Sequence, residues 1–144
     1  MATDQTEMVS WAGSTYRTIL SLEASNGAMS IVDSTTDVGS GPPRHVHANE
    51  DEIFVVLSGE IELWKAGELS RIGPGETGFI PRGMEHTFRV SSDLPCRHLV
   101  ILTPGGFEGF FFEMAAGNLS IPEDMPAIVA SGTAHGLTFT GPPL

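Results

Sequence analysis

Glycine and proline residues divide this chain into short segments along its whole length. The 144 residues include 17 glycines and 10 prolines, which are spread through the sequence rather than clustered. Short apolar runs lie between them, a spacing that is typical of all-β sandwiches and barrels and unfavourable for long helices. We therefore predict an all-β protein built from short strands.

Nine segments have the length and residue types of strands. They are residues 15–24, 29–35, 44–47, 52–57, 61–65, 69–72, 78–80, 86–91 and 96–103. Two short helices are predicted after them, over 107–116 and within 122–136. Because this length is close to the commonest domain size, we expect one domain over 1–144, with a barrel core at about 28–103 and a C-terminal extension over 104–144.

The overall charge restricts the partners. Eighteen acidic residues oppose seven basic ones and give a formal net charge of −11, which repels polyphosphates, so we expect no nucleic-acid partner. No apolar run approaches the roughly 20 residues of a membrane span. The first residues, MATDQTEMVS, lack the basic start and apolar stretch of a secretory signal, so we expect a soluble, cytoplasmic protein with no membrane partner. The single cysteine, Cys96, excludes an internal disulfide, and we interpret it as a buried apolar residue.

Two histidines and a glutamate stand at the start of an apolar strand, in the stretch RHVHANEDEIFVVL. Successive strand residues point to opposite faces, so His45 and His47 share one face, and Glu52 shares a face with Phe54 and Val56. If these faces meet, a buried carboxylate lies beside two imidazoles. Its desolvation costs several kcal/mol unless a cation compensates, and a divalent metal ion does so.

A further ligand is available from the segment GPGETGFIPRGMEHTFRV. His86, Phe88 and Val90 alternate with Thr87 and Arg89, which predicts a strand with His86 on its inward face. The glycines and prolines before it are typical of tight turns that bring this strand back beside the first. His86 is therefore a candidate fourth member of the site.

These residues resemble the two motifs of the cupin superfamily. The first motif is matched at every position, by Gly39, His45, His47, Glu52 and Gly59. The second is matched by Gly75, Pro81, Gly83 and His86, with Val90 in place of the usual Asn. Because that Asn is not usually a ligand, the departure leaves the metal site intact. The resemblance covers residues 39–90 and implies a small jelly-roll β-barrel of two antiparallel sheets with a His3Glu metal site.

The run LVILTPGGFEGFFFEMA, residues 99–115, is similar to the segment that follows the second motif in quercetin 2,3-dioxygenase-like cupins. This similarity implies a ring-cleaving dioxygenase that uses one divalent transition metal per chain, dioxygen, and a flavonol-like or enolisable small molecule. Imidazole and carboxylate ligands suit Fe, Ni, Mn, Co and Zn alike, so the metal is not identified. Glu52 would be both a ligand and the base that removes the substrate hydroxyl proton.

The substrate pocket is predicted from the same inward faces. The candidates are Phe54, Val56, Met84 and Phe88, with Phe110, Phe111 and Met114 as a lid. Core packing is the alternative for each of them. His98, outside both motifs, is either a pocket residue or a hydrogen-bonded structural histidine, and His135 is expected to be exposed.

Two other functions stay open. One is a metal-dependent lyase or isomerase acting on a small oxygenated acid or diketone, which would need a polar acid or base pair in the pocket. The inferred inward faces offer little such chemistry beyond the ligands, so we rank it second. The other is a non-catalytic small-molecule-binding cupin.

The strand at 52–57 is apolar on both faces, since Ile53, Val55 and Leu57 lie opposite the inward set. Such a strip is unusual on a monomer surface and predicts a cover. Cupins commonly pair through this sheet, so the resemblance favours a homodimer. The N-terminal strand and the tail helix are the alternatives.

Overall fold

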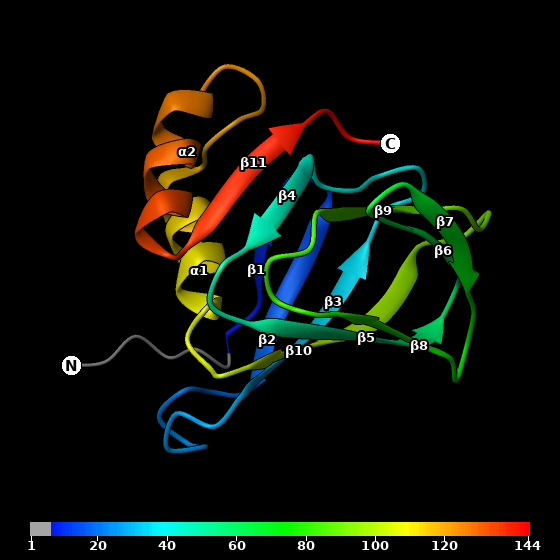
Figure 1. Ribbon diagram of the computed structural model, residues 1–144, viewed down its shortest axis with the longest axis horizontal. Coiled ribbons are helices and arrows are strands. Elements are labelled where there is room, and N and C mark those ends of the chain that lie inside the picture. The colour runs from blue at the N-terminus through cyan, green and yellow to red at the C-terminus, as the bar shows by residue number, and fades with distance from the viewer. Residues whose placement is uncertain (1–6) are drawn as a thin grey trace.

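Two antiparallel β-sheets make up most of the chain, which a computed structural model describes over residues 7–144 (Figure 1). One sheet has six strands in the order β1-β2-β3-β10-β5-β8, and the other has five in the order β11-β4-β9-β6-β7. The strands are β1 (Val9–Trp11), β2 (Ser14–Leu20), β3 (Ser30–Thr36), β4 (Arg44–His47), β5 (Asp51–Ser58), β6 (Ile61–Lys65), β7 (Glu68–Ile72), β8 (Thr77–Ile80), β9 (His86–Val90), β10 (Cys96–Thr103) and β11 (Leu137–Gly141). From β3 to β10 the chain passes repeatedly between the sheets, so the predicted cupin jelly roll is confirmed.

The predicted strands agree with the structure except at one end. Eight of the nine lie within one residue of their observed bounds, but the prediction of 15–24 is wrong for its last four residues, because the chain turns after Leu20. Asn26 and Gly27 lie in that turn with φ values of 54° and 85°. β1 and β11 were not predicted, and with β2 they extend the sheets beyond residues 28–103. Residues 1–6, which hold much of the stretch judged not to be a secretory signal, lie outside the described residues.

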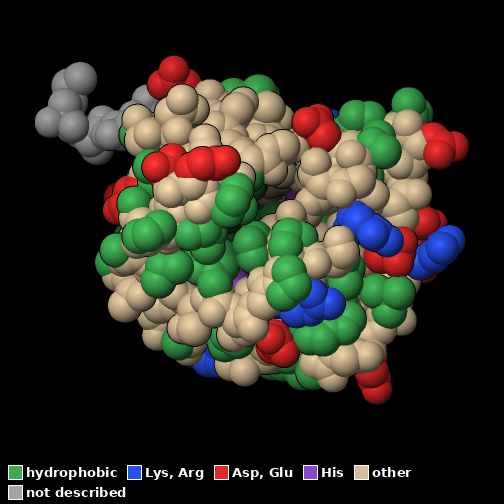
Figure 2. All heavy atoms as spheres, turned by 90° about the horizontal axis from the view of Figure 1, so that it is seen from above, with side chains coloured by type: hydrophobic (Ala, Val, Ile, Leu, Met, Phe, Trp, Pro, Cys, Tyr) green, Lys and Arg blue, Asp and Glu red, His purple; other side chains and the backbone are tan. Residues whose placement is uncertain are grey.

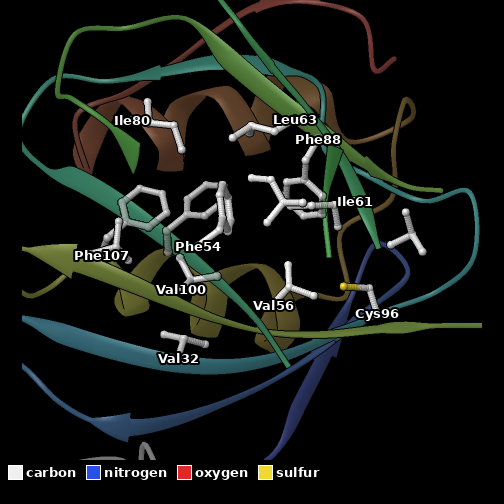
Figure 3. Close-up of a cluster of buried hydrophobic side chains, with 14 of the residues drawn as sticks. Val32, Phe54, Val56, Ile61, Leu63, Ile80, Phe88, Cys96, Val100 and Phe107 are labelled. Atoms are coloured by element: carbon white, nitrogen blue, oxygen red, sulfur yellow. The ribbon is translucent and has the colours of Figure 1, made fainter. Parts of the chain in front are cut away.

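The facing sides of the two sheets form the hydrophobic core (Figure 3). Inward and outward residues alternate, so that Phe54 and Val56 of β5 are buried while their neighbours are partly exposed. Phe54 meets Phe88 of β9 edge to face, with ring centroids 5.2 Å apart. Cys96 is buried as predicted, and burial raises the pKa of its thiol to about 11. The core thus holds the two sheets together, and the space between the sheets beside the core is where a site can form.

Two short helices lie on one side of the sheets, next to β1, β4 and β11 (Figure 1). They are α1 (Glu108–Gly117) and α2 (Met125–Ala134), close to both predicted helices. α1 carries aromatic rings against the six-stranded sheet, with Phe111 stacked on Tyr16 at 4.4 Å and Phe110 edge-on to Trp11 at 5.8 Å. Over residues 7–144, neither helix has the length and apolarity needed to cross a membrane.

A buried carboxylate fixes the start of α1. Glu108 is 1% exposed, and its Oε1 accepts hydrogen bonds from the Ser30 hydroxyl at 2.5 Å and the Gly106 amide at 3.0 Å. Its Oε2 accepts one from the amide of Leu22, in the turn after β2, at 2.9 Å. One side chain therefore ties α1 to β3 and to the β2–β3 turn.

Replacement of Glu108 by Gln should destabilise the fold. The amide NH2 of Gln would face a backbone or hydroxyl donor, leaving a buried donor unpaired at a cost of about 1–3 kcal/mol. The melting temperature should fall by roughly 3–12 °C for a domain of this size. Differential scanning calorimetry checks this, with Glu68→Gln on the exposed part of β7 as the matched control. Equal melting temperatures for the two variants would contradict the anchoring role.

The outer face of the six-stranded sheet carries an apolar patch, which we call the outer patch. It is centred on Ile53 and Val55 of β5, and Ile53 lies between Phe79 of β8 and Ile101 of β10. Phe79 is 52% exposed and Leu57 is 41% exposed. α1 packs on β1 and α2 on β11, so the tail helix does not cover this face, and β1 lies at the far edge of the sheet. We propose that a second copy of the chain covers the outer patch.

The dimer should be visible in solution. Sedimentation at micromolar concentration should give a mass near twice the 15.3 kDa of one chain. Val55→Asp should split the dimer, because an unpaired carboxylate buried in an apolar interface costs several kcal/mol. Ser70→Asp, on exposed β7 of the other sheet, should leave the mass unchanged. A wild-type mass near that of one chain would refute the proposal.

Candidate metal centre

Three buried histidines converge between the sheets. His45 and His47 alternate with Val46 on β4, and His86, the first residue of β9, is paired directly with His45. His45, His47 and His86 are 7%, 3% and 0% exposed, and one ligand atom from each lies within 4.8 Å of the others. On the face drawn in Figure 2, histidine side chains are visible only as small purple areas between other atoms. The arrangement places three imidazole nitrogens where one ion could bind them.

Hydrogen bonds at Nδ1 orient the imidazole rings. Nδ1 of His45 lies 2.7 Å from the carbonyl oxygen of Pro43, and Nδ1 of His86 lies 3.0 Å from that of Met84. A carbonyl only accepts, so each Nδ1 donates its proton there, and Nε2 of each ring is the nitrogen that faces the cluster. Nδ1 of His47 lies 3.4 Å from Oε1 of Glu50, close enough for an ionic contact although not aligned as a hydrogen bond. This is the support that metal-binding histidines usually receive on their far nitrogen.

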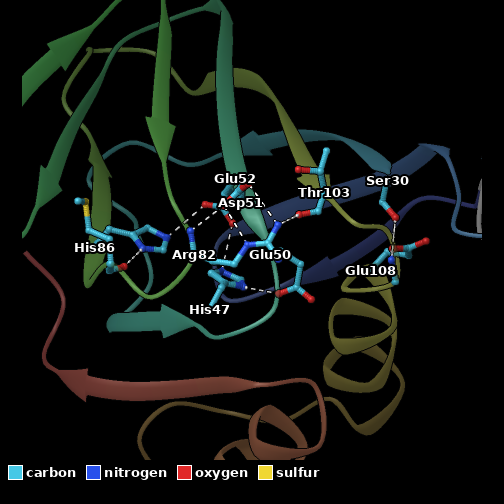
Figure 4. Close-up of polar contacts among 11 residues, drawn as sticks. Ser30, His47, Glu50, Asp51, Glu52, Arg82, His86, Thr103 and Glu108 are labelled. Atoms are coloured by element: carbon cyan, nitrogen blue, oxygen red, sulfur yellow. Dashed lines mark hydrogen bonds and ion pairs between the residues drawn. The ribbon is translucent and has the colours of Figure 1, made fainter. Parts of the chain in front are cut away.

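Glu52 faces the histidines from β5, as Figure 4 shows. Its Oε2 lies 3.1 Å from Nε2 of His47 and its Oε1 lies 3.3 Å from Nε2 of His86. Two ligands held at about 2.1 Å by one ion are roughly 3.0–3.4 Å apart at octahedral and tetrahedral angles. The spacing of these atoms and the His3Glu donor set therefore fit a divalent transition metal.

The charges in this cluster are strongly coupled. Burial, together with His86 and His47, lowers the pKa of His45 to about 3. Burial also acts to lower the pKa of His47, but the carboxylates of Glu52 and Glu50 outweigh it and raise the pKa to about 9. Burial acts to raise the pKa of Glu52, and the two neighbouring histidines overcome this and hold it well below its usual range. Glu52 is therefore ionised, and the protonated His47 or a bound cation balances its negative charge.

The turn before β9 positions His86. Gly83 has a φ of 83°, which favours glycine, and its amide donates to the carbonyl oxygen of His47 at 2.8 Å. The amide of Arg82 donates to Oδ1 of Asp51 at 2.9 Å, and its guanidinium pairs with the same carboxylate (Figure 4). Because Asp51 precedes Glu52, this turn joins β4, β5 and β9, the three strands that carry all four candidate ligands.

A cavity of about 80 Å³ adjoins His45, His47 and Glu52. Of the predicted pocket residues, the cavity wall includes Phe54, Phe88, His98, Phe110 and Phe111. It does not include Val56 and Met114, which are buried in the core, or Met84, which packs against the core. His135, expected to be exposed, is instead partly buried, with Nε2 3.1 Å from Oε1 of Glu113. Its ring joins α2 to α1.

Several residues of the cavity wall were not predicted. Polar side chains come from the first strands of the six-stranded sheet: Ser14, Tyr16, Ser34 and Thr36. Trp11, Phe107 and Phe139 add aromatic surface from β1, the start of α1 and β11. Burial raises the pKa of the Tyr16 phenol to about 12, so it stays protonated. The alternation of residues along β2 and β3 could have shown that these polar side chains point inward. Both faces of these strands carry polar residues, however, so the sequence did not indicate which face was the inner one.

A wider outer pocket of about 330 Å³ lies next to this cavity. The two share the wall residues Ala12, Gly41, Pro43, Phe88 and Ile121. The shared wall marks the side from which a small molecule could reach the histidines.

Comparison with known proteins identifies the family. A cupin domain model matches residues 33–102, which include all four candidate ligands. Residues 33–102 of this chain therefore form a cupin domain. Quercetin 2,3-dioxygenase of Bacillus subtilis is 27% identical over 96 residues, which cover 67% of this chain and 28% of that protein. The enzyme of the same name from Aspergillus japonicus is 27% identical over 99 residues, covering 65% and 28%.

This cupin thus spans little more than a quarter of the length of either quercetin dioxygenase. Among solved structures, ectoine synthase from P. lautus superposes with a TM-score of 0.66 at 17% identity, covering 99% of this chain and 86% of that one. KdgF from Halomonas sp. gives a TM-score of 0.63 at 19% identity, covering 69% and 87%. These structural likenesses show the shared fold.

Metal removal should destabilise the protein. An ion that binds only the folded state adds about 2.7 kcal/mol at a hundredfold excess over its Kd, so chelation should lower the melting temperature by roughly 5–15 °C. His86→Ala should reduce the metal content measured by elemental analysis and abolish this chelator-dependent shift. His135→Ala, away from the cluster, should keep both. Wild-type protein that takes up no transition metal would contradict the ligand assignment.

Proposed function

We propose that this cupin is a metal-dependent dioxygenase that cleaves a flavonol-like or other enolisable small molecule with dioxygen. The observation that carries the proposal is the buried His3Glu cluster at the end of an aromatic cavity. The similarity to two quercetin 2,3-dioxygenases, although limited to part of their length, supports the same reaction class.

Three histidines and one glutamate leave positions open on a metal ion, as a catalytic site requires. A bound ion would supply Lewis-acid or redox chemistry at those positions. Glu52 is ionised and its two oxygens lie between His47 and His86, so it would accept a proton from a substrate hydroxyl held beside it. The protein would thereby hold the enolate form next to the centre.

The rest of the cavity favours a planar, weakly polar substrate. Phe54, Phe88, Phe107 and Phe111 supply aromatic surface, and the hydrophobic wall excludes water from the reacting atoms. A volume of about 80 Å³ is far below the roughly 300–1,000 Å³ of pockets for drug-sized ligands. The cavity therefore favours the smaller members of this substrate class, or molecules that extend into the outer pocket.

A second candidate is a metal-dependent lyase or isomerase acting on a small oxygenated acid or diketone. The expectation that the inward faces offer little polar chemistry is not met, because Tyr16, Thr36 and His98 all line the cavity. A protonated phenol and a neutral imidazole can act as acid and base in such a reaction. A lack of polar groups in the pocket is therefore no longer a reason to rank the lyase or isomerase below the dioxygenase.

Oxygen uptake separates these functions. Metal-loaded protein should consume dioxygen with 3-hydroxyflavone or with the smaller kojic acid in an oxygen electrode. Glu52→Gln should lower the rate about 10²–10⁴-fold because it removes the base, and elemental analysis would show whether the metal is retained. Conversion without oxygen uptake would favour the lyase or isomerase. Binding without any conversion would indicate a non-catalytic cupin, and either outcome contradicts the dioxygenase.

A further inference from the structure

A second polar group lies in the cavity wall, apart from the candidate metal ligands. Ser34 of β3 and His98 of β10 are directly paired across the six-stranded sheet. Both side chains point inward, are 0% and 1% exposed, and line the cavity. Side chains paired in this way have Cβ atoms about 4.5–5.5 Å apart, so one small group could contact both. We call this pair the polar anchor.

Each member of the polar anchor has an unpartnered buried atom. Within residues 7–144, Oγ of Ser34 and Nδ1 of His98 have no hydrogen-bond partner. A buried donor or acceptor left unpaired costs about 1–3 kcal/mol, so such groups are rarely kept without a use. Two of them side by side on a cavity wall indicate that something else supplies their partner.

The imidazole of His98 is held in place by its other nitrogen. Nε2 lies 3.1 Å from Oγ1 of Thr36, which in turn lies 2.8 Å from Oγ of Ser14. Phe54 and Phe88 pack edge-on against the ring, with centroids 5.7 and 5.3 Å away. Nδ1 is therefore fixed in orientation, which lowers the entropy lost when it binds a ligand.

The chemistry of the anchor suits an uncharged oxygen. Burial lowers the pKa of His98 to about 4, so the ring is neutral near pH 7 and offers one donor or acceptor at Nδ1. The described cavity wall contains no Lys or Arg to balance an anionic group. A serine hydroxyl can both donate and accept, so the pair matches a hydroxyl or a carbonyl oxygen better than a phosphate or carboxylate.

We propose that Ser34 and His98 bind a neutral hydroxyl or carbonyl oxygen of the substrate, on the side of the molecule away from the oxygens held at the metal centre. This specificity rests on the proposed function, because it takes the histidine cluster as the site of the reacting end. Along β5, Glu52 and Val56, the residue paired with His98, are four positions or about 13 Å apart. The two sites can therefore hold opposite ends of one molecule.

Two pyrones test the proposal. Kojic acid and allomaltol share the hydroxy-ketone that chelates metals, but only kojic acid has a hydroxyl on the far side of the ring. Titration of each into cobalt(II)-loaded protein, followed by the visible cobalt spectrum and by calorimetry, gives two Kd values. Wild type should bind kojic acid roughly 3- to 10-fold tighter, the contribution of one neutral hydrogen bond.

Variants assign that preference to the anchor. Ser34→Ala and His98→Phe should each bring the ratio of the two Kd values close to one, whatever the absolute affinity, while elemental analysis shows unchanged cobalt content. Thr18→Val removes another buried hydroxyl from the neighbouring strand β2, outside the cavity wall, and should keep the preference. Ser34→Ala removes a single atom, and its thermal unfolding confirms that it is folded.

The outcomes separate the anchor from the metal centre. Equal affinity of wild type for both pyrones, or an unchanged ratio in both variants, would overturn the anchor and leave the proposed function standing. Binding of neither pyrone to fully loaded protein would overturn both proposals. Loss of the preference in Thr18→Val as well would show that general loosening, and not the anchor, sets the ratio, and would also overturn the proposal.

Discussion

The rest of the site depends on one electrostatic constraint, the ionised carboxylate of Glu52 inside an apolar barrel. A buried charge is costly unless it is paired, and here His47 and His86 contact both of its oxygens. Strands β4 and β9 of one sheet and β5 of the other must therefore keep the alignment that brings these side chains together. The hydrophobic core beside the site holds the sheets in that register, and Asp51 with Arg82 holds the turn that carries the last histidine.

The aromatic helix α1 acts on the same site from the other side. Phe107 packs edge-on against His47, with centroids 4.4 Å apart, and begins the helix that Glu108 anchors to β3. The contact of Glu108 at the start of α1 thus helps to fix a candidate ligand and to close the cavity. This arrangement explains why the segment after the second motif contains both a buried acid and a run of phenylalanines.

The sequence predicts the strands and the histidine cluster well because alternation and motif spacing both report them. The apolar alternation and the turns around the four candidate ligands assign each of them to one face of its strand. These ligands are His45, His47, Glu52 and His86. Residues 30–36 do not, since their inward set includes Ser34 and their outward set includes Ile31. The polar side of the cavity was missed for that reason. Val56 points inward as expected, but alternation does not distinguish a cavity wall from a packed core. Met114 of α1, expected in a lid, is buried in the core instead.

The pairing of β4 limits when the site can assemble. β4 carries two of the histidines, yet it is paired with β9 only through His45 and His86, whereas β11 pairs along it from Leu137 to Gly141. During synthesis, the strand that completes the bonding of β4 leaves the ribosome after every candidate ligand. The nascent chain therefore exposes its histidines and Glu52 before β11 can pair with β4 and enclose them.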